Sequence, residues 1–267
     1  MSKEQFTFIK LGGSVITDKD VAGKIRSEQL SSLVDQIKRA QTEVPGKKLI
    51  VGHGSGSFGH VPAAKFETIK GFVDEESILG AAIVQHAAAK LNREVVAEFI
   101  KNGLPAVTFA PSNTLIVEDH QAKQDFFNLL EVYLEKGLFP VTYGDVVADL
   151  KQGWTIWSTE EVLGSLAKMF LKKGQTVDSM VHVTQVAGFL NEKNETIPEI
   201  TAQTWPDLKK HLGQTRGTDV TGGMELKIEE SLKLAANGVQ SVILSGLTAD
   251  NLYNYLVGKN WIGTKIA

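Results

Sequence analysis

Ten residues, Val51 to His60, combine the residue types that bind phosphate groups. Their sequence, Val-Gly-His-Gly-Ser-Gly-Ser-Phe-Gly-His, holds four glycines, two serines and two histidines and overlaps the end of an apolar strand-like run, 48–51. Glycine lets a backbone bend sharply and lets a ligand approach main-chain N–H groups closely. Successive N–H groups at such a turn form an anion-binding concavity, and a following helix N-terminus adds positive potential. The segment predicts a phosphate-binding loop, with His60 placed to donate a hydrogen bond to an acceptor phosphate.

A second glycine turn, Gly-Gly-Ser at 12–14, follows the first predicted strand, 6–11. Lys10 lies near the end of that strand, and Lys19 follows the turn within reach of the same edge. Phosphoryl transfer needs positive charge around the migrating group and little covalent help, and two lysines beside a glycine turn meet that need. Two such turns indicate two phosphate groups held facing each other, as in a kinase. Taken alone, this turn is equally well a plain β-turn with solvated lysines.

The third signal is a pair of glycines, Gly222 and Gly223, at the start of a predicted helix, 222–237. Lys227 follows one turn into that helix. A helix N-terminus with a glycine turn and a lysine suits the β- and γ-phosphates of a nucleotide. The alternative is a capped surface helix with an exposed lysine.

Acidic residues near the middle of the chain allow two interpretations. Asp145 and Asp149 occupy alternating strand-like positions, where an acid either orients catalytic lysines or helps organise a magnesium–nucleotide complex. The alternative is a turn aspartate and a hairpin aspartate. Ser158-Thr-Glu-Glu161 predicts a helix cap with acids in the first turn. For His53 we expect no more than a role in shaping the phosphate-binding loop.

The composition narrows the class of protein. The chain has 267 residues, of which 42% are hydrophobic and 22% charged, with a formal net charge of −3 and no cysteine. These values are ordinary for a soluble globular protein, and no long basic run indicates a nucleic-acid surface. The absence of cysteine excludes disulfides, thiolate metal sites and cysteine nucleophiles. No signal peptide or run of roughly 20 apolar residues is visible, so we expect a cytoplasmic protein without a membrane span.

Common cofactor signatures are absent or incomplete. The P-loop pattern Gly-x-x-x-x-Gly-Lys-Ser/Thr does not occur. Gly54, Gly56 and Gly59 match the dinucleotide pattern Gly-x-Gly-x-x-Gly formally, but His60 and Pro62 follow where a dinucleotide-binding helix should run on. The other histidines show no metal-ligand spacing, so we expect no metal held by the protein itself.

Strand-like and helical runs alternate along the chain, which predicts a mainly parallel sheet with helices on both faces. In such sheets ligands bind outside the carboxyl ends of the strands. The predicted strands are 6–11, 49–51, 105–109, 115–117, 138–142, 145–149, 179–183, 239–244 and 261–266, and the predicted helices are 28–42, 76–102, 126–136, 158–173, 222–237 and 249–257.

Two further expectations concern how these elements assemble. Four positions after strand-like runs should gather at one edge of the sheet, namely Gly12, Gly52, Gly144 and Ser245-Gly246. We expect one continuous sheet and a single kinase domain with two lobes, 1–174 for acceptor binding and dimerisation and 175–267 for nucleotide binding. The apolar side of the longest helix is predicted to carry Ile78, Leu79, Ala82, Ile83, Ala87, Leu91, Val95 and Phe99.

Several motifs, in order from residue 6 to 266, resemble the amino acid kinase superfamily. They are Lys10-Leu-Gly-Gly-Ser14, Gly144-Asp-Val-Val147, Thr218-Asp-Val-Thr-Gly-Gly-Met224 with Lys227, and Gly263-Thr264. The loop from His53 to His60 is similar to that of the isopentenyl phosphate kinases in particular, because superfamily members acting on carboxylates typically lack this last histidine. The resemblance implies an α/β fold, an open αβα sandwich, and usually a homodimer. It also implies transfer of the ATP γ-phosphoryl group, with Mg²⁺ carried by ATP, to isopentenyl phosphate, a step of isoprenoid biosynthesis.

The same resemblance implies roles for individual positions. The nucleotide-binding residues would be Lys10, Gly12, Gly13, Ser14, Ser55, Gly222, Gly223 and Lys227. The acceptor phosphate would contact Gly54, Gly59 and His60, a substrate-contacting turn would include Ser158 and Thr159, and Ile83 would lie against the prenyl tail. The groups that stabilise the transition state or position the reactants would be Lys10, Lys19, His60 and Lys227.

This chain departs from the family in two segments. Ser158-Thr-Glu-Glu161 replaces a Ser-Gly-Asp-Asp-like turn, and Thr184-Gln-Val-Ala187 replaces a Thr-Asp-Val-Asp-like stretch, so Gln185 and Ala187 stand where aspartates are usual. The rival interpretations are a kinase for another small phosphate or phosphonate such as fosfomycin, a carboxylate kinase of the same fold, and a non-catalytic nucleotide-binding regulator.

Overall fold

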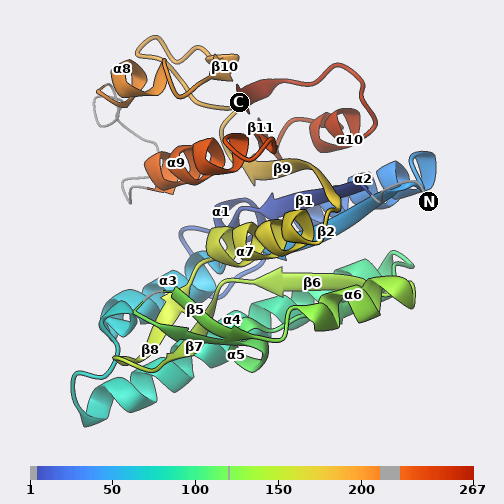
Figure 1. Ribbon diagram of the computed structural model, residues 1–267. Coiled ribbons are helices and arrows are strands. Elements are labelled where there is room, and N and C mark those ends of the chain that lie inside the picture. The colour runs from blue at the N-terminus through green and yellow to red at the C-terminus, as the bar shows by residue number, and fades with distance from the viewer. Residues whose placement is uncertain (1–4, 120, 211–222) are drawn as a thin grey trace.

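An eight-stranded sheet runs through the centre of the molecule (Figure 1), in a computed structural model that describes residues 5–119, 121–210 and 223–267. All neighbouring strands are parallel except β11 and β12, which are antiparallel. In spatial order the strands are β10 (Glu199–Ile200), β12 (Gly263–Ile266), β11 (Gln240–Ser245), β9 (Thr176–Thr184), β1 (Gln5–Leu11), β2 (Lys47–His53), β6 (Phe139–Tyr143) and β3 (Ala106–Thr108).

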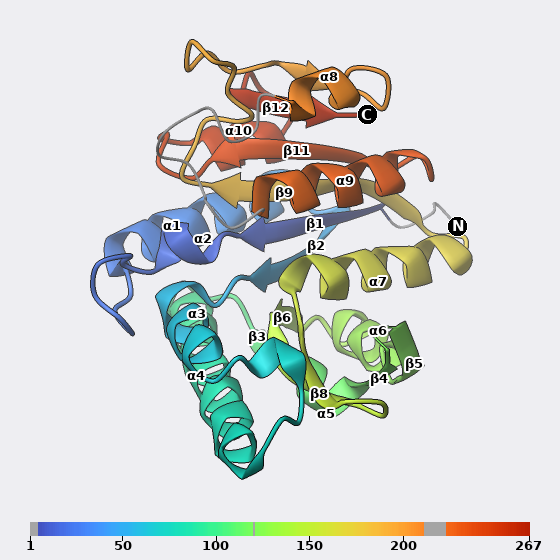
Figure 2. The same ribbon diagram turned by 90° about the vertical axis from the view of Figure 1, so that its left-hand side faces the viewer.

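Helices cover both faces of this sheet (Figure 2), and the alternation of side chains along β1 shows why. Ile9 and Leu11 pack toward α2 (Ser27–Glu43), the second half of α4 (Glu75–Lys101) and α10 (Asn251–Leu256). Phe6 and Phe8 pack toward α7 (Thr159–Lys172) on the opposite face, where α6 (Asn128–Glu135) and α9 (Gly223–Ala235) also lie. A strand buried on both sides is apolar at successive positions, as parallel sheets require. The three layers confirm the predicted αβα sandwich.

A second sheet of four strands lies beside β6 and β3, and the sequence did not predict it as separate. Its order is β5 (Gln121–Asp125), β4 (Leu115–Glu118), β7 (Asp145–Asp149) and β8 (Gly153–Trp157). The remaining short elements are α1 (Gly13–Ile16), α3 (Gly56–Lys65), η1 (Thr68–Lys70), α5 (Pro111–Thr114) and α8 (Trp205–Lys209). The main sheet runs on across residue 174, since β9 begins directly beyond it.

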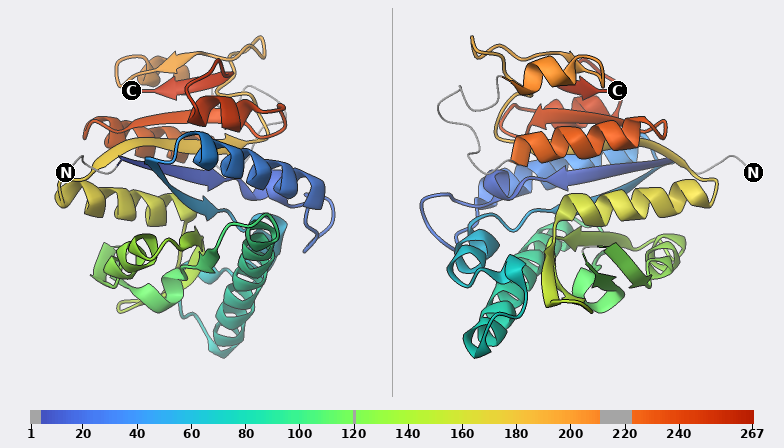
Figure 3. Two further views of the ribbon diagram at one scale, coloured as in Figure 1. Left: turned by 90° about the vertical axis from the view of Figure 1, so that its right-hand side faces the viewer. Right: turned by 60° about the vertical axis from the view of Figure 1, so that its left-hand side comes forward.

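Two local expectations were wrong. A helix, α3, does continue through His60 and Pro62. Pro62 is the seventh residue of this ten-residue helix. Its missing N–H costs the helix one hydrogen bond, and the helix continues past it. In the first half of α4 the predicted apolar face points outward: Ile78 and Leu79 are 53% and 63% exposed. Small residues face the protein there instead, because a Cβ on Gly80 would already lie 2.6 Å from the Phe66 side chain. Figure 3 shows how this end of α4 projects beyond the sheets.

Candidate active site

The carboxyl ends of the parallel strands are joined by backbone hydrogen bonds into one continuous edge. This arrangement confirms that Gly12, Gly144 and Gly246 gather there, whereas Gly52 lies within β2 and packs on Thr159 of α7. The bonds run from Gly246 N to Thr184 O (2.8 Å), from Gly12 N to Val183 O (2.8 Å), from Gly54 N to Leu11 O (2.9 Å) and from Gly144 N to His53 O (3.4 Å).

The two predicted glycine turns touch each other at this edge. A Cβ placed on Gly13 would lie 2.2 Å from the amide nitrogen of Gly56, and one on Gly54 would lie 2.9 Å from the amide nitrogen of Gly13. Gly56 has φ +48°, a conformation that side-chain-bearing residues rarely adopt. Glycine at all three positions therefore lets the turn after β1 and the N-terminus of α3 approach closely enough to serve one pair of neighbouring ligands.

Thr17 holds the two turns in register. Its hydroxyl donates to Gly13 O at 2.8 Å and accepts from the amide of Ser57 at 3.2 Å. The Ser57 hydroxyl is buried and has no hydrogen-bond partner in the described part of the chain. A buried hydroxyl at the N-terminus of α3 is available to donate to a bound group or to a water molecule. The positive end of the α3 helix dipole lies at the same place, so the arrangement favours an anion.

A cluster of two lysines and one glutamate lies beside these turns. Lys10 on β1 forms an ion pair with Glu160, the second residue of α7, and Lys227 Nζ approaches Glu160 Oε1 to 4.0 Å. Lys10 and Lys227 are 7% and 9% exposed, so their charges act in a medium of low dielectric constant. Burial alone would raise the pKa of Glu160, but the charges of the two lysines outweigh it and lower this pKa to about 2. One ionised carboxylate thus holds two ammonium groups together.

Glu160 is one residue that the sequence interpretation missed. The predicted cap is confirmed. The Ser158 hydroxyl accepts from the amide of Glu161 at 3.2 Å, and the Glu161 carboxylate accepts from the amide of Ser158 at 2.7 Å. That reciprocal pair uses Glu161 and leaves Glu160 turned toward the lysines. The capping pattern was thus the available signal, because it assigns one acid to the helix end and frees its neighbour.

Asp145 and Asp149 accept hydrogen bonds from backbone amides, which agrees with the second interpretation, a turn aspartate and a hairpin aspartate, rather than with residues that orient lysines. Asp145 accepts from the amides of Ser112 (3.1 Å) and Val146 (2.9 Å), and Asp149 accepts from the amide of Lys151 at 2.8 Å. Burial raises the pKa of Asp145. Both carboxylates are used in shaping the β7–β8 hairpin and its surroundings, and Glu160 has the role expected of them.

The other predicted site residues lie on several different elements. The carbonyl of Ser14 accepts from the Gln185 side chain at 2.7 Å, so the residue that replaces an aspartate in this chain supports the first glycine turn. Lys19 is exposed, His60 is exposed on α3, and Ile83 is 38% exposed on α4. The hydroxyl of Thr159 is bonded to His53 O at 2.8 Å, and a Cβ on Gly59 would lie 2.4 Å from Ser55 Oγ. Gly223 begins α9, while Gly222 lies outside the described residues.

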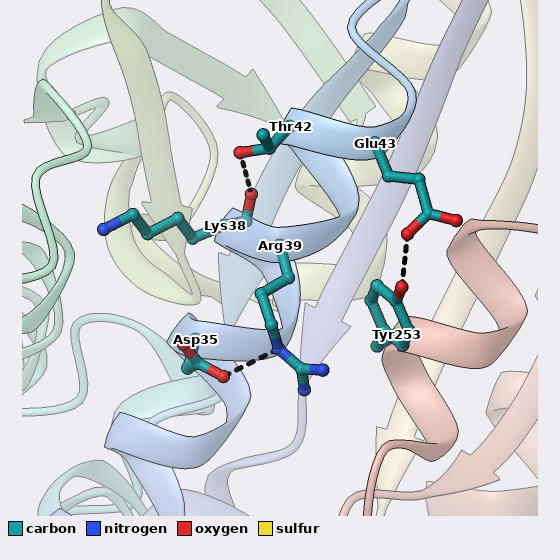
Figure 4. Close-up of a pocket in the computed structure, with 6 residues that line it drawn as sticks. All are labelled: Asp35, Lys38, Arg39, Thr42, Glu43 and Tyr253. Atoms are coloured by element: carbon teal, nitrogen blue, oxygen red, sulfur yellow. Dashed lines mark hydrogen bonds and ion pairs between the residues drawn. The ribbon is translucent and has the colours of Figure 1, made fainter.

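No group of three metal-ligating side chains comes together within residues 5–119, 121–210 and 223–267. Over the same residues no helix is long and apolar enough to span a bilayer. A surface hollow of about 500 Å³ lies between α2 and α10 (Figure 4), away from the glycine turns. Its lining is internally paired: Arg39 bonds to Asp35 at 2.8 Å, and the Tyr253 hydroxyl donates to Glu43. The bond between Tyr253 and Glu43 ties α10 to α2.

Known proteins share this architecture over nearly the whole chain. An isopentenyl phosphate kinase of Methanothermobacter thermautotrophicus is 31% identical over 97% of both chains, and one of Methanocaldococcus jannaschii is 30% identical over 95% of both. A solved structure described as an isopentenyl phosphate kinase superposes with a TM-score of 0.80 at 28% identity, covering 98% of this chain and 100% of that one. The sequence profile described as "Amino acid kinase family" matches residues 5–245. The chain belongs to the amino acid kinase family.

Proposed function

We propose that this protein is a phosphotransferase that moves the γ-phosphoryl group of ATP to isopentenyl phosphate, giving isopentenyl diphosphate. The curated relatives named above carry that activity in their names and match this chain end to end. The observation that carries the proposal is the contact between the two glycine turns. Two anion-binding turns that touch, with two buried lysines alongside, suit two phosphate groups placed end to end.

The donor and the acceptor have separate places in this proposal. The nucleotide phosphates lie against the first turn and the start of α9, at Lys10, Gly12, Gly13, Ser14, Ser55, Gly222, Gly223 and Lys227. The acceptor phosphate lies against the N-terminus of α3, held by Gly54, Gly59 and His60, with Ser158 and Thr159 nearby. The prenyl tail runs toward α4 and Ile83. In this arrangement the lobe 1–174 supplies the acceptor contacts and part of the nucleotide contacts, and the lobe 175–267 supplies the remaining nucleotide contacts.

To promote this reaction the protein needs mainly to position the two phosphate groups and to stabilise their negative charge. The attacking phosphate oxygen is already ionised, so no strong general base is needed. In the transition state negative charge spreads over the migrating group, and Lys10, Lys19 and Lys227 offset it. Glu160 holds two of these lysines at the site before the nucleotide arrives, which lowers the reorganisation needed for reaction. His60 orients the acceptor phosphate.

Mg²⁺ fits the site as a companion of ATP. The described residues hold no cage of three metal-ligating side chains, and the one carboxylate beside the lysines is paired with Lys10. Magnesium commonly binds through substrate phosphates with few protein ligands. We propose that phosphate oxygens of ATP are its principal ligands here, and that it neutralises charge on the β- and γ-phosphates.

A cytoplasmic homodimer is the form we propose for the working enzyme. The support for a dimer is the set of exposed apolar side chains where α4 projects, Ile69, Phe72, Val73, Ile78 and Leu79. Apolar surface of this kind usually marks an interaction site. Light scattering of the purified protein measures the mass directly, and Leu79→Glu should reduce a dimer to monomers.

The function is tested by ADP release with ATP and Mg²⁺ on isopentenyl phosphate, fosfomycin and acidic amino acids in parallel. We expect turnover on isopentenyl phosphate, with the diphosphate identified by ³¹P NMR. Higher kcat/KM on fosfomycin would favour the phosphonate kinase, and turnover of an acidic amino acid would favour the carboxylate kinase. ATP binding without turnover on any acceptor would favour a regulator.

A further inference from the structure

His53 lies beneath the phosphate-binding loop and is fully buried at the end of β2. Its ring stacks on Tyr143, with centroids 5.8 Å apart and an interplanar angle of 13°. Both ring nitrogens have partners: Nε2 lies 3.1 Å from Asn92 Nδ2, and Nδ1 lies 3.2 Å from Gly54 O. The imidazole therefore connects α4, which carries Asn92, to the first peptide of the loop.

The neighbours of Asn92 determine which imidazole nitrogen carries the proton. The Asn92 side chain places its nitrogen 3.4 Å from Val141 O, which only accepts, and its oxygen 2.6 Å from the Thr108 hydroxyl, which donates. The amide group facing Nε2 is thus a donor, and Nε2 must be bare to accept from it. Burial lowers the pKa of His53 to about 4, so the ring is neutral at pH 7 and has a single N–H. That N–H is on Nδ1 and donates to Gly54 O.

Holding this carbonyl also sets the direction of the next amide. The peptide between Gly54 and Ser55 is planar and trans, so its N–H points opposite to its C=O. With the carbonyl held against the buried ring, the Ser55 amide is directed away from the ring. The backbone carbonyl of His53 meanwhile accepts from Thr159, next to Glu160. A single residue therefore joins the loop to the start of α7.

We propose that His53 is a positioning residue: its Nδ1–H tautomer, selected by Asn92, orients the Gly54–Ser55 peptide so that the Ser55 amide faces the bound phosphates, where the acceptor and the nucleotide meet. This inference rests on the proposed function, in which the loop binds the acceptor. It gives His53 a defined task through the loop, without contact to the substrate. It also gives α4 an indirect influence on the phosphate site, through Asn92.

Two substitutions of His53 test the roles of the two ring nitrogens independently. In His53→Asn the side-chain amide occupies the place of Nδ1 and still donates to Gly54 O, while the Asn92 contact is lost. In His53→Gln the side chain reaches the place of Nε2 and accepts from Asn92, while the Gly54 bond is lost. Both variants remove a buried ring stacked on Tyr143, so both should lower the melting temperature similarly.

The expected results differ in the KM for isopentenyl phosphate. The KM of His53→Asn should stay within about threefold of that of the natural protein. His53→Gln should raise this KM at least tenfold, which is about the effect of losing one hydrogen bond. In His53→Gln the KM for ATP should rise less than the KM for isopentenyl phosphate, because Ser55 is one of many residues assigned to the nucleotide. Equal KM values for isopentenyl phosphate in the two variants, at equal melting temperatures, would show a packing role alone and overturn the proposal.

The tautomer is measured separately by ¹⁵N NMR of histidine-labelled protein, assigned with His53→Asn. We expect Nδ1 to carry the proton and Nε2 to be bare at pH 7. An Nε2–H tautomer overturns the proposal whatever the substrate. If the tautomer is as expected but the natural protein does not turn over isopentenyl phosphate, the proposed function fails, and the same two variants are compared on whichever acceptor the parallel assay identifies.

Discussion

Gly13 and Gly56 are packed so closely that a Cβ on the first would lie 2.2 Å from the amide nitrogen of the second. They come from different strand–helix turns and meet at the carboxyl edge of the sheet. A side chain at either position must push the turns apart. The contact therefore sets the distance between the two predicted phosphate sites.

Gly13→Ala should separate the turns and lower kcat/KM by about a hundredfold or more, since a displacement of about 1 Å is enough for a loss of that size. The kinetic assay is ADP release with ATP and isopentenyl phosphate. Gly46→Ala is the matched control, because a Cβ there meets nothing within 4 Å. Full activity of Gly13→Ala would mean that the spacing of the turns is unimportant for catalysis.

Glu160→Gln should lower kcat about tenfold to a hundredfold, because Lys10 and Lys227 would then repel each other without a carboxylate between them. Glu161→Gln is the neighbouring control, since glutamine keeps the capping pattern at that position. Steady-state kinetics at saturating ATP distinguish the two. Equal activity of both variants would exclude Glu160 as the group that holds the lysines.

His60→Ala should weaken binding of the acceptor by about 1–3 kcal/mol, the range for losing a hydrogen bond to a charged group, while the KM for ATP stays unchanged. His86→Ala removes another exposed histidine, on α4, and serves as the control. The KM for each substrate is read from initial rates. Natural KM values for isopentenyl phosphate in His60→Ala would remove this residue from the acceptor site.

Acidification from pH 7 to 5.5 should destabilise the fold through two buried histidines. Burial lowers the pKa of His53 to about 4 and that of His182 to about 3, from 6.5 in the unfolded chain. Between the folded and unfolded values only the unfolded chain binds the protons. The free energy of unfolding therefore decreases as pH falls below 6.5. Its slope approaches about 1.4 kcal/mol per pH unit for each histidine.

Urea unfolding at several pH values measures this slope. His182→Gln should reduce it by the share of one histidine, and His86→Gln, on the surface of α4, should leave it unchanged. A slope that is the same in all three proteins would contradict burial of a neutral His182.

The layers of the fold were predictable from sequence because hydrophobic periodicity records burial. Leu30, Leu33, Val34 and Ile37 recur on one face of α2, and all are buried. The same signal failed in the first half of α4, where apolar side chains lie outside and Gly80 faces the protein. Close packing selects a small residue there, and hydrophobicity does not report that.

The site was predictable to the level of its turns and lysines, and less so in its pairings. Glycine clusters after strands indicate the turns. Contact between Gly13 and Gly56 depends on the order of the strands in the sheet, which the local sequence does not determine. Glu160 and Asn92 were missed for the same reason. Their partners, Lys10 and His53, are 150 and 39 residues away along the sequence.

The most direct measurement of the central claim is a crystal structure with isopentenyl phosphate and a non-hydrolysable ATP analogue bound together. The account predicts the γ-phosphate at the Gly13 turn and the acceptor phosphate at the N-terminus of α3, with His60 within hydrogen-bond distance of the acceptor. An acceptor phosphate bound away from α3, or His60 remote from any phosphate oxygen, would contradict it.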